Sequence, residues 1–93
     1  MYKFKLYITI RETRKSIRLL NNIMLVLERS LSEPYTLDVI DILDHPQEAV
    51  DAEIFATPTL VRLEPLPVKK IIGDLIERRM VLEKLGILTS THP

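Results

Sequence analysis

Three prolines in the second half of the chain set the strongest limits on how it can fold. Pro58 stands directly before the apolar run 59–63, and Pro65 and Pro67 follow that run closely. Proline fixes its own φ and has no amide hydrogen to donate, so within sheets it is confined to strand starts, edges and bulges. We therefore expect a short strand over 59–63 that begins after Pro58 and ends before Pro65.

The first third of the chain changes from a strand period to a helix period. Apolar residues occupy every second position over 2–10, which predicts a strand with one strongly apolar face. Over 17–31 they recur at steps of three and four, which predicts an amphipathic helix ending near Pro34. The expected buried stripe of this helix is Ile17, Leu20, Ile23, Met24, Leu27 and Leu31.

Shorter elements follow. Residues 35–42 are rich in β-branched and aromatic types and predict a second strand. Pro46 suits the first turn of a brief helix over 47–55, whose apolar positions are Ala49, Val50, Ile54 and Phe55. The segment 68–73 fits either a strand or the start of a helix.

The carboxyl-terminal part predicts a last helix from Leu75 onward, with Gly86 as its terminator and 89–93 as a frayed tail. Ninety-three residues favour one domain, which we place at 1–93 with an ordered core at about 5–88. The order strand–helix–strand–helix–strand–strand–helix is similar to the α/β thioredoxin-like arrangement, βαβαββα. Right-handed crossovers would make its first two strands parallel and its last two antiparallel.

In such folds a proline at the position of Pro58 follows a cis peptide bond, and the alternative is an ordinary trans proline that opens a strand. A hydroxyl from Ser16 or Thr13, beside Pro58, could activate a bound thiol such as glutathione. The interpretation favoured by the residues alone is that Ser16 or Thr13 caps the first helix.

Composition excludes several classes of function. The chain has no cysteine, which excludes disulfides, thiol catalysis and iron–sulfur clusters within it. Thirteen basic residues balance thirteen acidic ones, so there is no general electrostatic attraction to nucleic acid and little net charge to oppose self-association. No run is apolar for long enough to span a membrane and the amino terminus does not resemble a signal peptide, so we expect a soluble, cytoplasmic protein.

Three polar groups each have two interpretations. His45 with Asp41 and Asp44 could bind a metal, although a solvated polar loop is the more ordinary explanation. Two clusters of charged residues could each contact a partner or only face solvent. They are the acidic group Glu48, Asp51 and Glu53 and the basic group Arg11, Arg14, Lys15 and Arg18.

Four stretches resemble one family. These are Val-Ile-Asp-Ile-Leu at 39–43, Pro-Gln at 46–47, Ala-Thr-Pro-Thr-Leu at 56–60 and Pro-Val-Lys-Lys-Ile-Ile-Gly-Asp-Leu at 67–75. Together they are similar to the KaiB family of circadian clock proteins. The resemblance implies a regulator without catalytic activity or cofactor that binds the hexameric ATPase KaiC, competes with the SasA kinase and, in cyanobacteria, captures KaiA. It also implies a second fold, βαββααβ, which assembles as a tetramer.

The resemblance also implies which residues would carry these functions. The ring-binding surface would be Lys5, Pro46, Gln47, Ala49, Asp51 and Pro58, and the KaiA-facing edge would include Asp38 and Ile40. The region that changes fold would contain Pro58, Pro65, Pro67, Gly73 and Asp74. The alternatives are a SasA-like sensory domain and a cysteine-free, glutathione-type small-ligand protein.

Overall fold

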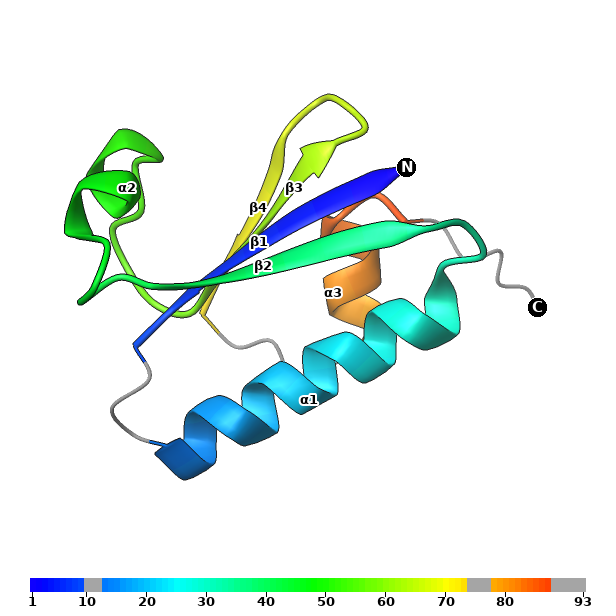
Figure 1. Ribbon diagram of the computed structural model, residues 1–93. Helices are drawn as coiled ribbons and strands as arrows, with labels where there is room; N and C mark the ends of the chain where they lie inside the picture. The colour runs from blue at the N-terminus through cyan, green and yellow to red at the C-terminus, as the bar shows by residue number, and fades with distance from the viewer. Residues whose placement is uncertain (10–12, 74–77, 88–93) are drawn as a thin grey trace.

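The computed structural model describes residues 1–9, 13–73 and 78–87, and its strands form a four-stranded sheet in the order β2-β1-β3-β4 (Figure 1). The elements are β1 (Tyr2–Ile8), α1 (Thr13–Ser30), β2 (Tyr35–Asp41), α2 (Pro46–Asp51), β3 (Thr59–Glu64), β4 (Lys69–Ile72) and α3 (Arg78–Lys84). Helices α1 and α3 lie on the same side of the sheet, and α2 lies beyond the carboxyl end of β2 (Figure 1). The predicted residues Arg11 and Asp74 and the segment 89–93 lie outside the described residues.

Strand pairing confirms the thioredoxin-like α/β class. Strand β1 pairs with β2 in parallel and with β3 antiparallel, and β3 pairs with β4 antiparallel. The segment 68–73 thus contains a strand, which decides between the two interpretations of that segment. No helix among the described residues is long and apolar enough to cross a bilayer.

The core lies between the sheet and the pair α1 and α3. Alternate side chains of β1 point into it, as the period of two predicts, and they meet apolar side chains from both helices. The fully buried members include Phe4, Leu6, Ile23, Leu27, Leu60, Ile71, Val81 and Leu85. Truncating a side chain of this kind to alanine costs about 2–5 kcal/mol, so this layer holds the fold together.

The buried stripe predicted for α1 is wrong at two positions. Ile23 and Leu27 are 1% and 0% exposed, as expected, but Ile17 and Met24 are 51% and 44% exposed. Val26 is buried in their place. The apolar arc of α1 is wider than the surface that the sheet and α3 can cover, so residues on the flank of the arc stay in solvent.

Helix α2 is shorter than predicted, and the expected packing of Phe55 is wrong. The helix ends at Asp51, and Glu53 takes a left-handed conformation with φ of 57° that turns the chain away. Phe55 is consequently 87% exposed, whereas Ala49 is the buried residue of the helix.

The end of α3 confirms Gly86 as the terminator. Gly86 has φ of 71°, its amide donates to the Glu83 carbonyl, and the Ile87 amide donates to the Leu82 carbonyl. These two bonds form a Schellman motif, which leaves the side chains of Leu82 and Ile87 packed into the core.

One basic side chain is buried within this frame. Arg62 on β3 is 5% exposed, and its guanidinium donates to the Leu85 carbonyl at 2.6 Å and to the Pro67 carbonyl at 2.8 Å. Its Nε has no hydrogen-bond partner. Arg62 therefore joins the end of α3 to the turn between β3 and β4, a role that was not predicted from the sequence.

Candidate partner-binding surface

An ion pair joins β1 to α2. Lys5 lies on the face of the sheet opposite α1, and its ammonium binds the Glu48 carboxylate at 3.1 Å. The hydrogen bond to Glu48 raises the pKa of Lys5, and the nearby Tyr7 and Asp38 act in the same direction. Asp38 stands beside Lys5 in the register of β1 and β2. Lys5, Glu48 and Asp38 thus form one charged group across three elements.

Two of the predicted contact residues are buried in this fold. Ile40 of β2 is 7% exposed and stands beside Tyr7, which is 3% exposed and whose pKa is raised by burial. Ala49 of α2 is 6% exposed. In this conformation the side chains of Ile40 and Ala49 are therefore buried and are not open to direct contact with a partner.

The remaining predicted residues of α2 face solvent. Pro46 occupies the first turn, and the Gln47 amide donates to the Asp51 carboxylate at 2.9 Å. Asp41, beside this helix, uses a carboxylate oxygen to accept the Leu43 amide, as in an Asx turn. Among the described residues no three His, Asp or Glu side chains are arranged to hold a metal ion, so His45 has no metal-binding cluster around it there.

The segment 41–56 combines negatively charged side chains with exposed apolar ones. It has five carboxylates and no lysine or arginine: Asp41, Asp44, Glu48, Asp51 and Glu53. Val50 and Phe55 are 67% and 87% exposed within it. Large apolar side chains set among like charges are typical of a protein-binding surface rather than of a small-molecule pocket.

The peptide bond before Pro58 is cis, as predicted, and so are those before Pro65 and Pro67. The Pro58 carbonyl accepts the Gly73 amide at 3.0 Å, which connects the start of β3 to the end of β4. The predicted switch residues Pro58 and Gly73 are thereby adjacent.

A cavity of about 300 Å³ lies between Pro58 and the start of α1, and both Ser16 and Pro58 line it. The Ser16 hydroxyl donates to the Thr9 carbonyl at 2.8 Å. Ser16 lies inside α1, which begins at Thr13, so it is not the cap that was expected. Because the hydroxyl proton is already used, this geometry gives the thiol-activating alternative no support.

Two features of this surface were not predicted from the sequence: the burial of Tyr7 and the pairing of Lys5 with Glu48. Tyr7 alternates with the core residues of β1, so the period of two predicted that its side chain would face solvent, whereas it is 3% exposed. The contact between Lys5 and Glu48 joins residues 43 positions apart, and no local pattern reports such a contact.

The fold and the surface define a thioredoxin-like α/β domain without the cysteines of a redox enzyme. Its structural neighbours agree on the fold. The solution structure of the N-terminal domain of Synechococcus elongatus SasA has a TM-score of 0.68 and 22% identity, and covers 98% of this chain and 89% of its own. The crystal structure of mitochondrial thioredoxin 3 from Saccharomyces cerevisiae has a TM-score of 0.65 and 16% identity, and covers 94% of this chain and 78% of its own.

Sequence comparison identifies the family. Residues 5–87 match the KaiB domain. The circadian clock oscillator protein KaiB of Gloeothece citriformis (strain PCC 7424) is 45% identical over 87 residues, which are 94% of this chain and 81% of the relative. The KaiB of Synechococcus elongatus (strain PCC 7942) is also 45% identical over 87 residues, 84% of its length. The chain belongs to the KaiB family.

Proposed function

We propose that this chain is a non-enzymatic, cytoplasmic regulator that binds the ring of a KaiC-type hexameric ATPase through the face formed by β1 and α2. The observation that carries the proposal is membership of the KaiB family over nearly the whole chain. The proposed contacts are Lys5, Pro46, Gln47, Asp51 and Pro58, with Ala49 supporting them from beneath. Asp38 and Ile40 belong to the edge that would meet a KaiA-type partner where one exists.

The chemistry of this face supports a protein partner. Its carboxylates around the exposed Val50 and Phe55 would complement a partner surface that is basic and apolar. Charge would steer the approach, and the apolar side chains would supply the buried area after docking.

The test mixes the purified chain with the KaiC-type ATPase of the same organism and ATP, and follows mass by size exclusion with light scattering over hours. We expect a ring-sized complex that forms slowly. If no complex forms in any nucleotide or phosphorylation state of the ATPase, the proposal is wrong. Asp51→Lys should weaken capture about tenfold or more, a loss of about 1.4 kcal/mol, because it reverses a charge at the centre of the surface.

We also propose that the region with Pro58, Pro65, Pro67, Gly73 and Asp74 exchanges between two folds. Strand β4 supports this, since only Ile71 of its four residues is buried and it lies at the edge of the sheet. Local stability is low where few apolar side chains are buried. Pro65→Ala and Pro67→Ala are expected to change the exchange kinetics and the oligomer distribution, and two unchanged variants would count against the exchange.

A SasA-like sensory role is the second candidate, favoured by the structural likeness to the SasA N-terminal domain. It predicts a protein that binds the ATPase without a slow phase and stays monomeric throughout. Binding kinetics in the same mixing experiment separate the two roles.

A further inference from the structure

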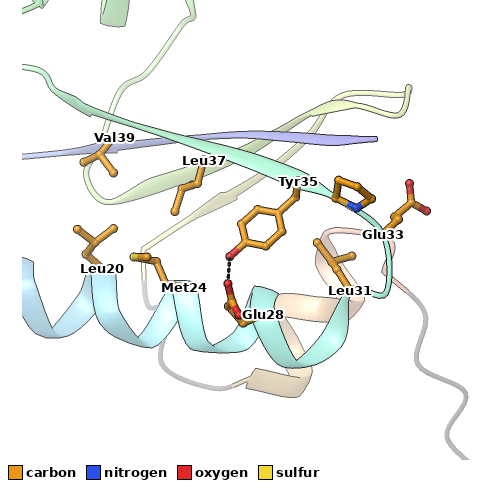
Figure 2. Close-up of a pocket in the computed structure, with 9 residues that line it drawn as sticks. Leu20, Met24, Glu28, Leu31, Glu33, Tyr35, Leu37 and Val39 are labelled. Carbon is orange, nitrogen blue, oxygen red and sulfur yellow. Dashed lines mark hydrogen bonds between the residues drawn. The ribbon is translucent and has the colours of Figure 1, made fainter.

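Helix α1 and the edge strand β2 enclose an apolar groove of about 520 Å³. Figure 2 shows Leu20 and Met24 of α1 on one wall and Leu37 and Val39 of β2 on the other. From Leu20 to Glu28 the groove follows α1 for about 12 Å, since each helical residue rises about 1.5 Å. Sites for small molecules have volumes of about 300–1,000 Å³, so the groove is large enough for a ligand with an apolar body of this length.

One end of the groove is acidic. Glu28 of α1 and Glu33 of the loop after it line this end, and none of the described lining residues is a lysine, arginine or histidine. The residues three and four positions from Glu28 along the chain are uncharged, so no basic neighbour on its own helix can pair with it. Glu28 also stands in the last turn of α1, where the helix dipole favours a positive charge. A cation is therefore the group that this end of the groove lacks.

The hydrogen bonds at this end leave room for such a cation. The Met1 ammonium lies 3.2 Å from a Glu33 carboxylate oxygen, which shows that an ammonium group can approach here. Among the described residues, Glu28 accepts only the Tyr35 hydroxyl, at a long distance of 3.4 Å (Figure 2). A carboxylate has about four acceptor positions, so Glu28 keeps most of its capacity for a charged donor.

Tyr35 adds an aromatic wall beside Glu28. Its ring is positioned by an edge contact with Phe4, with the ring centroids 6.2 Å apart. Burial, and to a smaller extent Glu28, raises the pKa of the Tyr35 hydroxyl, so the phenol stays neutral at physiological pH. A cation beside Glu28 would thus meet a carboxylate and the face or edge of a tyrosine ring in one place, and Tyr35 would add no competing charge.

We propose that this groove binds a small amphiphilic amine, whose apolar body lies between α1 and β2 and whose ammonium group binds Glu28 beside the Tyr35 ring. The carboxylates at the acidic end disfavour an anionic amphiphile such as a fatty acid, and an uncharged one would gain nothing from Glu28. Leu37 and Val39 alternate along β2 with Asp38 and Ile40, so the groove lies on the other face of the strand from those proposed contacts. The proposal therefore does not rest on the proposed function.

The first test titrates the full chain with three probes of one length: n-octylammonium, n-octanol and octanoate. Amide chemical shifts follow binding at probe concentrations below those that form micelles. We expect saturable shifts along the groove, with octylammonium binding about threefold to fivefold more tightly than octanol, as one solvent-exposed ion pair provides, and octanoate binding most weakly. Equal affinities for octylammonium and octanol would overturn the proposal. Shifts that never saturate, or that spread over the whole chain, would also overturn it.

Glu28→Gln tests the proposed ammonium contact. This variant should bind octylammonium no more tightly than octanol, while its affinity for octanol stays that of the wild type. Glu53→Gln is the control, because it removes the same charge from an exposed residue outside the groove. If Glu28→Gln keeps the preference for octylammonium, or if Glu53→Gln loses it as well, Glu28 does not bind the ammonium group and the proposal is wrong.

A pair of neighbouring residues on α1 tests the place of the apolar body. Met24 and Leu25 are 44% and 48% exposed, but only Met24 lines the groove. Met24→Lys brings a competing ammonium into the groove and should weaken the binding of octylammonium at least tenfold. Leu25→Lys adds the same charge to the same helix outside the groove and should change binding less than twofold. Equal effects of the two variants, with circular dichroism showing both to be folded, would mean that the ligand does not occupy the groove.

Discussion

At the scale of single residues, the ion pair of Lys5 and Glu48 ties α2 to the sheet. The side chains are 29% and 40% exposed, so solvent screens the pair, and Glu48→Gln should cost about 0.5–1 kcal/mol of unfolding free energy at neutral pH. Urea denaturation measures this cost. Glu64→Gln is the control, because its pair with Lys3 is longer, at 3.7 Å, and more exposed. Equal costs for both variants would contradict a special role for Glu48.

The same pair has a defined pH dependence. The folded-state pKa of Lys5 is raised above the ordinary value of 10.5, chiefly by its hydrogen bond to Glu48. The stabilisation is therefore complete below 10.5 and is lost as the pH rises through the folded pKa. The difference between wild type and Glu48→Gln should vanish in that range, which denaturation curves at alkaline pH can check. A difference that persists unchanged would show that the pair acts through packing rather than charge.

The side chain of Arg62 makes two hydrogen bonds to backbone carbonyls, and their loss should destabilise the fold. Replacing it by methionine keeps most of the buried volume but leaves the carbonyls of Leu85 and Pro67 without their donor, so we expect a loss of about 1–3 kcal/mol. Lys70→Met is the control, because its bond to the Ala52 carbonyl lies at the surface. Amide hydrogen exchange should become faster selectively in α3 and near Pro67. An equal increase in exchange rate along the whole chain would contradict a local role of these hydrogen bonds.

At the scale of elements, Gly86 ends α3 and limits the space around Arg62. Gly86→Ala forces a left-handed φ on alanine and places a Cβ 3.0 Å from the Arg62 guanidinium, so we expect a loss of about 1–3 kcal/mol. Gly73→Ala is the matched control, because Gly73 also has a left-handed φ, of 95°, but its added Cβ would meet no atom within 4 Å. If the control costs as much, crowding at Arg62 contributes nothing.

The side of α1 that faces the sheet can be tested by substitution. Ile23→Ala should cost about 2–5 kcal/mol of unfolding free energy because Ile23 is fully buried, whereas Ile17→Ala should change it by less than about 0.5 kcal/mol. Thermal denaturation measures both. Similar costs at the two positions would mean that the helix faces the sheet with its other flank.

These elements also show what the sequence could predict. Local periodicity predicted β1 and α1, residue type predicted β2, and the glycine rule predicted the end of α3, because these features depend on neighbours in the chain. Which side chains of α1 are buried depends on how much surface the sheet offers, and the exposure of Phe55 depends on the turn at Glu53. The contacts of Lys5 with Glu48 and of Arg62 with Leu85 join distant segments, which no local pattern encodes.

At the scale of the whole molecule, the core helices and the proposed binding face lie on different sides of the sheet. Helices α1 and α3 cover one side (Figure 1), whereas Lys5 and its partner Glu48 lie on the other. The face of β1 and α2 is acidic and apolar around Val50. A substitution on this face should therefore change binding and leave the core unchanged.

We accordingly expect Asp51→Lys to lose capture by a KaiC-type ring while keeping the midpoint of thermal denaturation of the wild type, and Ile17→Asp, on the other side of the sheet, to retain capture. Light scattering with the ring and thermal denaturation without it report the two properties on the same samples. If Ile17→Asp also abolishes ring capture while remaining folded, the binding face extends beyond β1 and α2. The assignment of capture to one side of the sheet would then be wrong, because a residue of α1 would be required for it.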